Sequence, residues 1–116
     1  MNKFKELKVW QKAIQLVTKI YSRTSNFPKE EMYGIVSQIR RCAVSIPSNI
    51  AEGAGRGGKK EFSHFLDIAR GSSFELETQL IISKELGFLN QFNFDNLYSE
   101  LDEIQKMITG LQKSMI

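Results

Sequence analysis

Apolar residues recur at alternating intervals of three and four along most of this 116-residue chain. Such spacing is typical of amphipathic α-helices and differs from the period of two that marks half-buried strands. The clearest example lies in the last quarter of the chain, where the apolar positions are Phe94, Leu97, Leu101, Ile104, Ile108, Leu111 and Met115. Because no segment shows the strand period, the sequence predicts an all-α protein.

Four segments carry the helical spacing, over about residues 6–23, 28–52, 59–86 and from 93 to the chain end. The connections between them are short, and short connections place consecutive helices antiparallel to one another. A length of 116 residues suits one domain. We therefore expect an antiparallel up-down-up-down four-helix bundle that spans residues 1–116.

Residues at the helix ends support these boundaries. Pro28 suits the first turn of the second helix, where its missing N–H group costs no hydrogen bond. Gly87 suits a left-handed C-cap of the third helix. Asn93 suits the N-cap of the fourth helix, with Phe92 and Leu97 as a hydrophobic staple across it.

Two of the helices have apolar residues on more than one face. The first helix has a main apolar stripe and a second stripe beside it that widens the apolar face. The main stripe is Leu7, Trp10, Ile14, Val17 and Tyr21. The second stripe is Ala13, Leu16 and Ile20. The third also has two stripes, one of Phe62, Leu66, Ala69, Ser73, Leu76 and Leu80, the other of Phe65, Ile68, Ser72, Gln79 and Ile82. The second helix has one face, formed by Ile35, Ile39, Cys42, Ile46 and Ile50. The surplus apolar area predicts contacts between subunits.

Pro47 interrupts the second helical segment, but the apolar spacing continues in phase from Ile46 to Ile50. A helix that restarted at Pro47 would be too short to be stable alone. We therefore expect one continuous, kinked helix. If the second and third helices pair antiparallel about the glycine-rich turn, Gly71 lies level with residues 42–43. Small residues at these positions would allow the two helices to pack closely.

Charge is distributed unevenly along the chain. Residues 1–60 hold twelve Lys and Arg against four Asp and Glu, whereas residues 61–116 hold four against nine. Two explanations are open: opposite charges pair between antiparallel helices, or one part of the molecule faces nucleic acid. In the first explanation, Arg40 and Arg41 pair with Glu75 and Glu77 of the third helix.

The turn AGRGGKK holds the basic residues that we expect to be most available to a ligand. Arg56, Lys59 and Lys60 lie among glycines near the start of a helix, where a phosphate group is favoured. Lys3, Lys5 and Lys8 add to this surface, and Arg40 and Arg41 join it if they have no internal partners. The predicted nucleic-acid-binding residues are Arg56, Lys59, Lys60, Arg40 and Arg41.

No catalytic or metal site is expected. Cys42 is the only cysteine and shares a face with isoleucines, which indicates a small core residue. His64 is the only histidine, so a single chain cannot supply the two Glu-x-x-His pairs of a di-iron site, although Glu61 forms one such pair with it. The sequence GAGRGG follows a helix, whereas a dinucleotide-binding loop follows a strand. We therefore predict no cofactor, no metal and no enzymatic activity.

The location expected from the sequence is the cytoplasm. No apolar run approaches the roughly 20 residues of a membrane-spanning helix. The sequence MNKFKELKVWQK lacks the apolar centre of a signal peptide. A single cysteine makes an internal disulfide impossible, which fits a reducing compartment.

Several motifs closely resemble those of the bacterial four-helix bundle proteins that are encoded in intervening sequences of large-subunit ribosomal RNA genes. They are FKELKVWQKAIQLV, QIRRCAVSIPSNIAEG, KKEFSHFLDIARGSSFELETQL and KELGFL. The resemblance implies a four-helix bundle that assembles into a homo-oligomer, a ring-like pentamer. A similar bundle is the accessory protein of diversity-generating retroelements, a basic pentameric barrel that engages nucleic acid and a reverse transcriptase.

Two functions are consistent with these features. One is an oligomer that binds RNA or DNA through clustered basic residues with low sequence selectivity. The other is an assembly or adaptor protein for a partner such as a polymerase or a ribosomal protein, with no direct role for nucleic acid. The first depends on the exposed charges, and the second on the surplus apolar surface.

Overall fold

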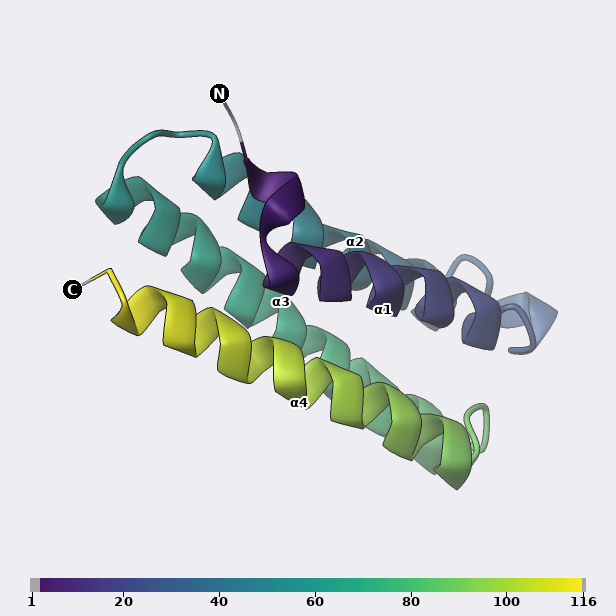
Figure 1. The fold of residues 1–116 in the computed structure, drawn as a ribbon. Helices are drawn as coiled ribbons and strands as arrows, with labels where there is room; N and C mark the ends of the chain where they lie inside the picture. The colour runs from purple at the N-terminus through teal and green to yellow at the C-terminus, as the bar shows by residue number, and fades with distance from the viewer. Residues whose placement is uncertain (1–2, 116) are drawn as a thin grey trace.

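The computed structural model describes residues 3–115, which contain helices and turns and no strand. The elements are η1 (Phe4–Glu6), α1 (Lys8–Thr24), η2 (Lys29–Glu31), α2 (Ile35–Ala54), α3 (Lys59–Glu85) and α4 (Gln91–Lys113), where η denotes a single 3-10 turn. Consecutive helices lie side by side and α4 returns to contact α1, which closes a four-helix bundle (Figure 1). The predicted all-α four-helix bundle is confirmed. None of the helices in the described residues has the length and hydropathy of a membrane-spanning segment.

The core is one continuous cluster along the bundle axis. Its largest fully buried side chains are aliphatic and come from all four helices: Leu16, Ile20, Ile39, Ile46, Ile50, Leu66, Leu76, Leu80, Leu97, Leu101, Ile104 and Ile108. The faces predicted for α2, α3 and α4 supply most of them. Burying each such side chain contributes roughly 1.5–3 kcal/mol, so the three–four spacing accounts for most of the packing in this fold.

The inward face of α1 differs from the prediction. Ile14 and Tyr21 of the predicted main stripe are exposed, whereas Ala13, Leu16 and Ile20 of the adjacent stripe are buried. Both stripes have helical spacing, so the sequence of α1 alone does not decide between them. The positions of α2 and α4, which α1 contacts, select the second stripe.

The start of α2 also differs from the prediction. Pro28 precedes the single 3-10 turn η2, and the α-helix begins only at Ile35, after Gly34. The polar segment between these residues has no apolar periodicity, so its backbone could not be predicted from spacing. From Ile35 onward α2 runs without interruption through Pro47, which confirms that the helix is continuous.

The pairing of α2 with α3 is displaced from the predicted one. Each residue of α2 lies level with a position about one helical turn further along α3 than predicted. The Ser45 and Ser72 hydroxyl oxygens lie 2.8 Å apart across this interface. Gly71 does not mark a close contact, because a Cβ atom there would have no neighbour within 4 Å. The close contact is at Gly53, where a Cβ atom would lie 2.6 Å from Phe65 Cβ.

The connection between α3 and α4 is defined by backbone hydrogen bonds. Gly87 has a φ of 81°, which confirms the predicted left-handed cap. Its N–H donates to the Lys84 carbonyl oxygen, and the Phe88 N–H donates to that of Ser83, which together form a Schellman motif.

The N-cap of α4 is Asn90 rather than Asn93. The Asn90 Oδ1 accepts a hydrogen bond from the Asn93 N–H at 2.7 Å. Phe92 is 78% exposed, so it does not form the predicted staple with Leu97. With the cap at Asn90, the two staple positions are those of Leu89 and Phe94, and both side chains are buried.

Candidate nucleic-acid interface

The antiparallel topology brings basic residues from three separate segments to one end of the bundle. Figure 1 shows that η1, the connection between α2 and α3, and the last turn of α4 all lie at this end. Its exposed basic side chains are Lys3, Lys5, Lys8, Arg56, Lys59, Lys60 and Lys113. The same segments hold three exposed carboxylates, those of Glu6, Glu52 and Glu61. We call this surface the basic end.

Charge pairing accounts for the basic residues further along α1. The Lys12 ammonium lies 3.0 Å from a Glu103 carboxylate oxygen, and Lys19 forms an ion pair with Glu100. Both pairs join α1 to α4, and therefore join the basic half of the sequence to the acidic half. Charge pairing thus accounts for the basic residues along the side of the bundle, whereas the basic end holds exposed positive charge.

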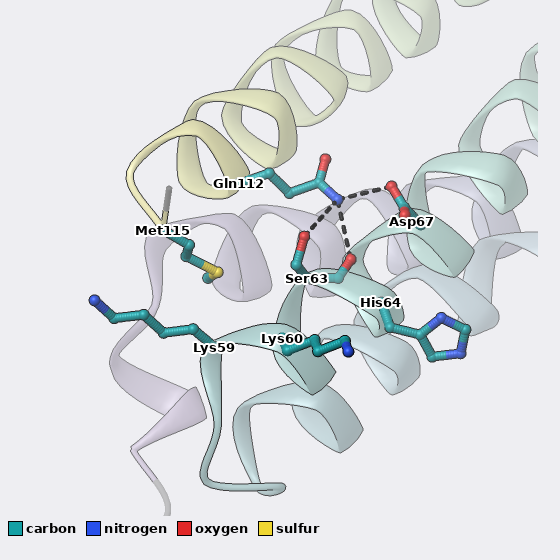
Figure 2. A pocket seen from close by; sticks show the side chains of 7 residues that line it. All are labelled: Lys59, Lys60, Ser63, His64, Asp67, Gln112 and Met115. Carbon is teal, nitrogen blue, oxygen red and sulfur yellow. Dashed lines mark hydrogen bonds between the residues drawn. The ribbon is translucent and has the colours of Figure 1, made fainter.

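Lys59 and Lys60 are the two exposed lysines of the basic end that come from the start of α3. Both lie in the first turn of α3, are exposed, and form no ion pair within residues 3–115. They border a shallow pocket of about 510 Å³ whose other lining residues include Ser63, His64, Asp67 and Gln112. Figure 2 shows the two lysine side chains extending in different directions from the helix.

The floor of this pocket is held by Gln112. Its Nε2 donates to the Asp67 Oδ1 at 2.8 Å and to the Ser63 carbonyl oxygen at 3.0 Å (Figure 2). These bonds fasten the end of α4 to the start of α3. The Asp67 carboxylate makes the floor unfavourable for an anion, so the lysines at the rim are the groups suited to phosphate.

Arg56 is less available than the sequence predicted. Its Nε and one terminal nitrogen donate to Glu52 Oε2 at 3.2 and 2.9 Å. The guanidinium carbon also lies 5.0 Å from the centre of the Phe65 ring. Both members of the ion pair are about half exposed, and such pairs contribute only about 0–1 kcal/mol. A phosphate group can therefore replace Glu52 at small cost.

The prediction that Arg40 pairs with Glu75 or Glu77 is wrong. The Arg40 Nε donates to Thr24 Oγ1 at 3.0 Å, so the side chain turns toward α1 and away from α3. The Glu77 carboxylate instead accepts a hydrogen bond from Gln105 of α4 at 3.0 Å. A long side chain on a bundle helix can reach either neighbouring helix, and the sequence does not show which one.

Arg41 is exposed and forms no ion pair within the described part of the chain. It lies near the start of α2, whereas Arg56 follows the end of that helix. At 1.5 Å per residue, Arg40 and Arg56 are separated by about 24 Å along the helix axis. The five predicted residues therefore form two surfaces at opposite ends of α2.

The candidate catalytic groups are not brought together. Cys42 is buried, which raises the pKa of its thiol, and the nearby negative charge of Glu75 raises that pKa further. His64 is exposed and contacts the edge of the Phe65 ring, with 5.5 Å between ring centres. Within residues 3–115 no three His, Cys, Asp or Glu side chains are grouped so that they could hold a metal ion.

Comparison with known protein families agrees with the motifs seen in the sequence. The sequence model of the 23S rRNA-intervening sequence protein family matches residues 5–110. The chain belongs to this family. The resemblance that the motifs indicated is therefore confirmed.

This 23S rRNA-intervening sequence family member shares its fold with a solved structure. That structure is a protein with unknown function from the S23 ribosomal protein family of Bacteroides thetaiotaomicron VPI-5482. The TM-score is 0.82 at 22% sequence identity, and the match covers 90% of this chain and 98% of that chain. At this identity the likeness shows the fold alone. Comparison with curated protein sequences gives no match.

In this family member the structure also groups two tyrosines for which the sequence predicted no site: Tyr33 was not singled out, and Tyr21 was placed in the apolar stripe of the first helix. Tyr21 and Tyr33 lie beside Arg40 and Arg41 in a groove at the end opposite the basic end. The sequence contained one signal for them: Tyr33 stands in the polar segment EEMYG, outside any apolar stripe. An aromatic residue in such a place has no evident core role.

Proposed function

We propose that this protein is a non-catalytic, oligomeric RNA- or DNA-binding protein of the cytoplasm. The observation that carries the proposal is the gathering of basic residues from three segments at one end of the bundle. Lys59 and Lys60 are exposed and unpaired within the described residues, and the ion pair of Arg56 is exposed and exchangeable. Phosphate groups are the ligands that such a surface favours.

Low sequence selectivity follows from the type of contact. Lysine ammonium groups bind phosphates as point charges, and phosphate contacts carry no direct information on base sequence. Binding should therefore be similar for unrelated sequences and should weaken steeply as salt displaces the bound charges.

Exposed apolar residues on α3 support association between copies. They are Ile68, Phe74, Ile81 and Ile82, with Leu86 directly after the helix, each at least 40% exposed. Large apolar side chains that stay exposed in a monomer are typical of surfaces that bind another protein. The family resemblance implies a pentamer, in which five basic ends bind one nucleic acid together and multiply a weak individual affinity.

The basic end can be tested with a charge variant and a matched control. Lys59→Gln/Lys60→Gln removes two exposed charges there, and Lys84→Gln/Lys106→Gln removes two charges elsewhere. Fluorescence anisotropy with labelled RNA and DNA at several salt concentrations measures both affinity and its salt dependence. We expect the first variant to lower the slope of log K against log salt by about 1.4–1.8, and the control to leave it almost unchanged. No binding to RNA or DNA at low salt by the unmodified protein would refute the proposal.

A second candidate function is supported by the same apolar residues of α3. They could bind a polymerase or a ribosomal protein, in which case the protein is an adaptor. Affinity capture after nuclease treatment separates the two functions. Two results together would favour the adaptor. One stoichiometric partner is recovered with the unmodified protein but not with Ile68→Ser/Ile82→Ser, and the purified protein has no affinity for RNA or DNA.

A further inference from the structure

An open groove lies at the end of the bundle opposite the basic end. It has a volume of about 510 Å³ and is formed by the last turns of α1, the segment before α2 and the first turns of α2. The residues that matter to its chemistry are two tyrosines, two arginines and two smaller apolar side chains: Tyr21, Tyr33, Arg40, Arg41, Met32 and Val44. We call it the tyrosine–arginine groove.

Arg40 is fixed in position on one wall of this groove. Its Nε donates to Thr24 Oγ1 at 3.0 Å, and a terminal nitrogen donates to the Tyr21 carbonyl oxygen at 3.3 Å. Its guanidinium carbon lies 4.5 Å from the centre of the Tyr21 ring. The hydroxyl of Thr24 is itself bonded to the Ile20 carbonyl oxygen at 2.7 Å. A guanidinium has five N–H donors, so this arrangement orients Arg40 and leaves donors for a ligand.

Tyr33 presents an almost fully exposed ring on an ordered backbone. Its side chain is 96% exposed. The residues on either side are held by backbone hydrogen bonds, from the Met32 N–H to the Lys29 carbonyl oxygen at 3.1 Å and from the Gly34 N–H to that of Glu31 at 3.0 Å. The ring contributes nothing to the core, and the backbone that carries it is held on both sides.

The charge of the groove is positive. Its lining includes two arginines and no carboxylate. The Glu31 carboxylate of η2 lies over Gly34, outside the lining. Arg41 is exposed and is not engaged in an ion pair within residues 3–115. An anionic ligand with flat apolar parts therefore matches this groove better than a cationic or purely aliphatic one.

We propose that the tyrosine–arginine groove binds unpaired nucleotides of a single-stranded nucleic acid. The Tyr33 ring and the Tyr21–Arg40 stack offer faces for bases, and Arg41 offers its charge to the phosphates. Aromatic side chains beside arginines are the common means of binding single strands, because every base has a face that can stack. A base inside a duplex has both faces covered, so the groove selects single strands. This inference rests on the proposed function and specifies the form of nucleic acid that the protein binds.

The test uses Tyr33→Ala and a matched control, Phe92→Ala. Phe92 is also a highly exposed aromatic residue, 78% exposed, but it lies at the start of α4 outside the groove. The probes are a labelled 20-nucleotide single-stranded RNA, the DNA strand of the same sequence, and the corresponding duplexes. We expect the unmodified protein to bind single strands more tightly than duplexes. Tyr33→Ala should weaken single-strand binding by about 5- to 150-fold, without change in the salt slope, whereas Tyr33→Phe and Phe92→Ala should bind normally.

The outcomes separate this inference from the function on which it rests. If neither single strands nor duplexes bind at low salt, the proposed function itself fails. If nucleic acid binds and Tyr33→Ala leaves single-strand affinity unchanged, or weakens duplex binding equally, only the groove proposal is overturned. It is also overturned if Tyr33→Ala lowers the oligomer mass in size-exclusion chromatography, because the groove is then a contact between proteins.

Discussion

Gly53 on α2 and Phe65 on α3 lie so close that a Cβ atom on the glycine would be 2.6 Å from the Cβ of the phenylalanine. The same atom would lie 3.3 Å from the carbonyl oxygen of Phe62. These neighbours cannot rotate away as the end of a flexible side chain can. Gly53 therefore sets the distance between the end of α2 and the start of α3. The turn that carries the charges of the basic end follows directly after this contact.

Gly53→Ala should destabilise the protein. Overpacking of a tight contact costs about 1–3 kcal/mol, which outweighs the roughly 1 kcal/mol that alanine gains over glycine in helix propensity. Urea denaturation followed by circular dichroism measures the free energy of unfolding. Gly71→Ala is the control, because a Cβ atom there meets nothing within 4 Å; it should stabilise the protein by about 0.5–1 kcal/mol. Equal effects of the two substitutions would show that the contact is not close.

Asn90→Ala should lower the free energy of unfolding by about 1 kcal/mol, the usual effect of losing an N-cap side chain. The Asn90 side chain accepts the hydrogen bond of the cap, whereas Asn93 contributes only its backbone N–H group. Asn93→Ala keeps that group and places a better helix former in the first turn. It should therefore be neutral or slightly stabilising in the same urea experiment. A larger loss for Asn93→Ala than for Asn90→Ala would contradict the cap assignment.

The errors in the predicted fold occur where periodicity gives no information. Apolar spacing predicted the extents of α3 and the buried faces of α2, α3 and α4, because burial of such faces is what holds a bundle together. It could not predict the 3-10 turn after Pro28, where the residues are polar. Nor could it choose between Asn90 and Asn93 as the cap, since that depends on backbone angles at one residue.

The candidate site was predictable only in its charges. The lysines of the turn after α2 could be recognised from their glycine-rich surroundings. The partners of Arg40 could not, because the pairing of α2 with α3 differs by about one turn from the predicted one, and because Arg40 reaches Thr24 on another helix. The grouping of Tyr21 with Tyr33 depends on the path of the segment before α2, which has no apolar periodicity from which a structure could be predicted.

Cys42 should react slowly with iodoacetamide, and the pH at which its alkylation rate rises should depend on the charges beside it. Burial, the charge of Glu75 and a hydrogen bond with Glu75 raise the pKa of the thiol, whereas a hydrogen bond with Gln79 and the charge of Arg41 lower it. Because the folded-state pKa is raised, protonation of the thiol favours the folded state. That contribution is complete below the ordinary value of 9.0 and is lost as the pH rises through the folded-state pKa.

The pH dependence of the alkylation rate tests these causes separately. Glu75→Gln removes a negative charge, so the rate should begin to rise at lower pH. Arg41→Gln removes a positive charge, so the rise should move to higher pH. No shift in either variant would show that burial alone sets the pKa of Cys42.

Lys19→Ala and Glu100→Ala should show a measurable coupling in a double-mutant cycle, larger than that of Lys12 and Glu103. Both ion pairs join α1 to α4, but the Glu100 side chain is 25% exposed and that of Glu103 is 53% exposed. A less exposed carboxylate is screened less by water and salt. We expect a coupling near the upper end of the roughly 0.2–1 kcal/mol range of surface pairs for Lys19–Glu100, and near the lower end for Lys12–Glu103.

Urea denaturation at low and high salt measures the coupling energies of both ion pairs. Salt should reduce the Lys12–Glu103 coupling proportionally more, and the reverse order would show that burial of the carboxylate does not govern these pairs.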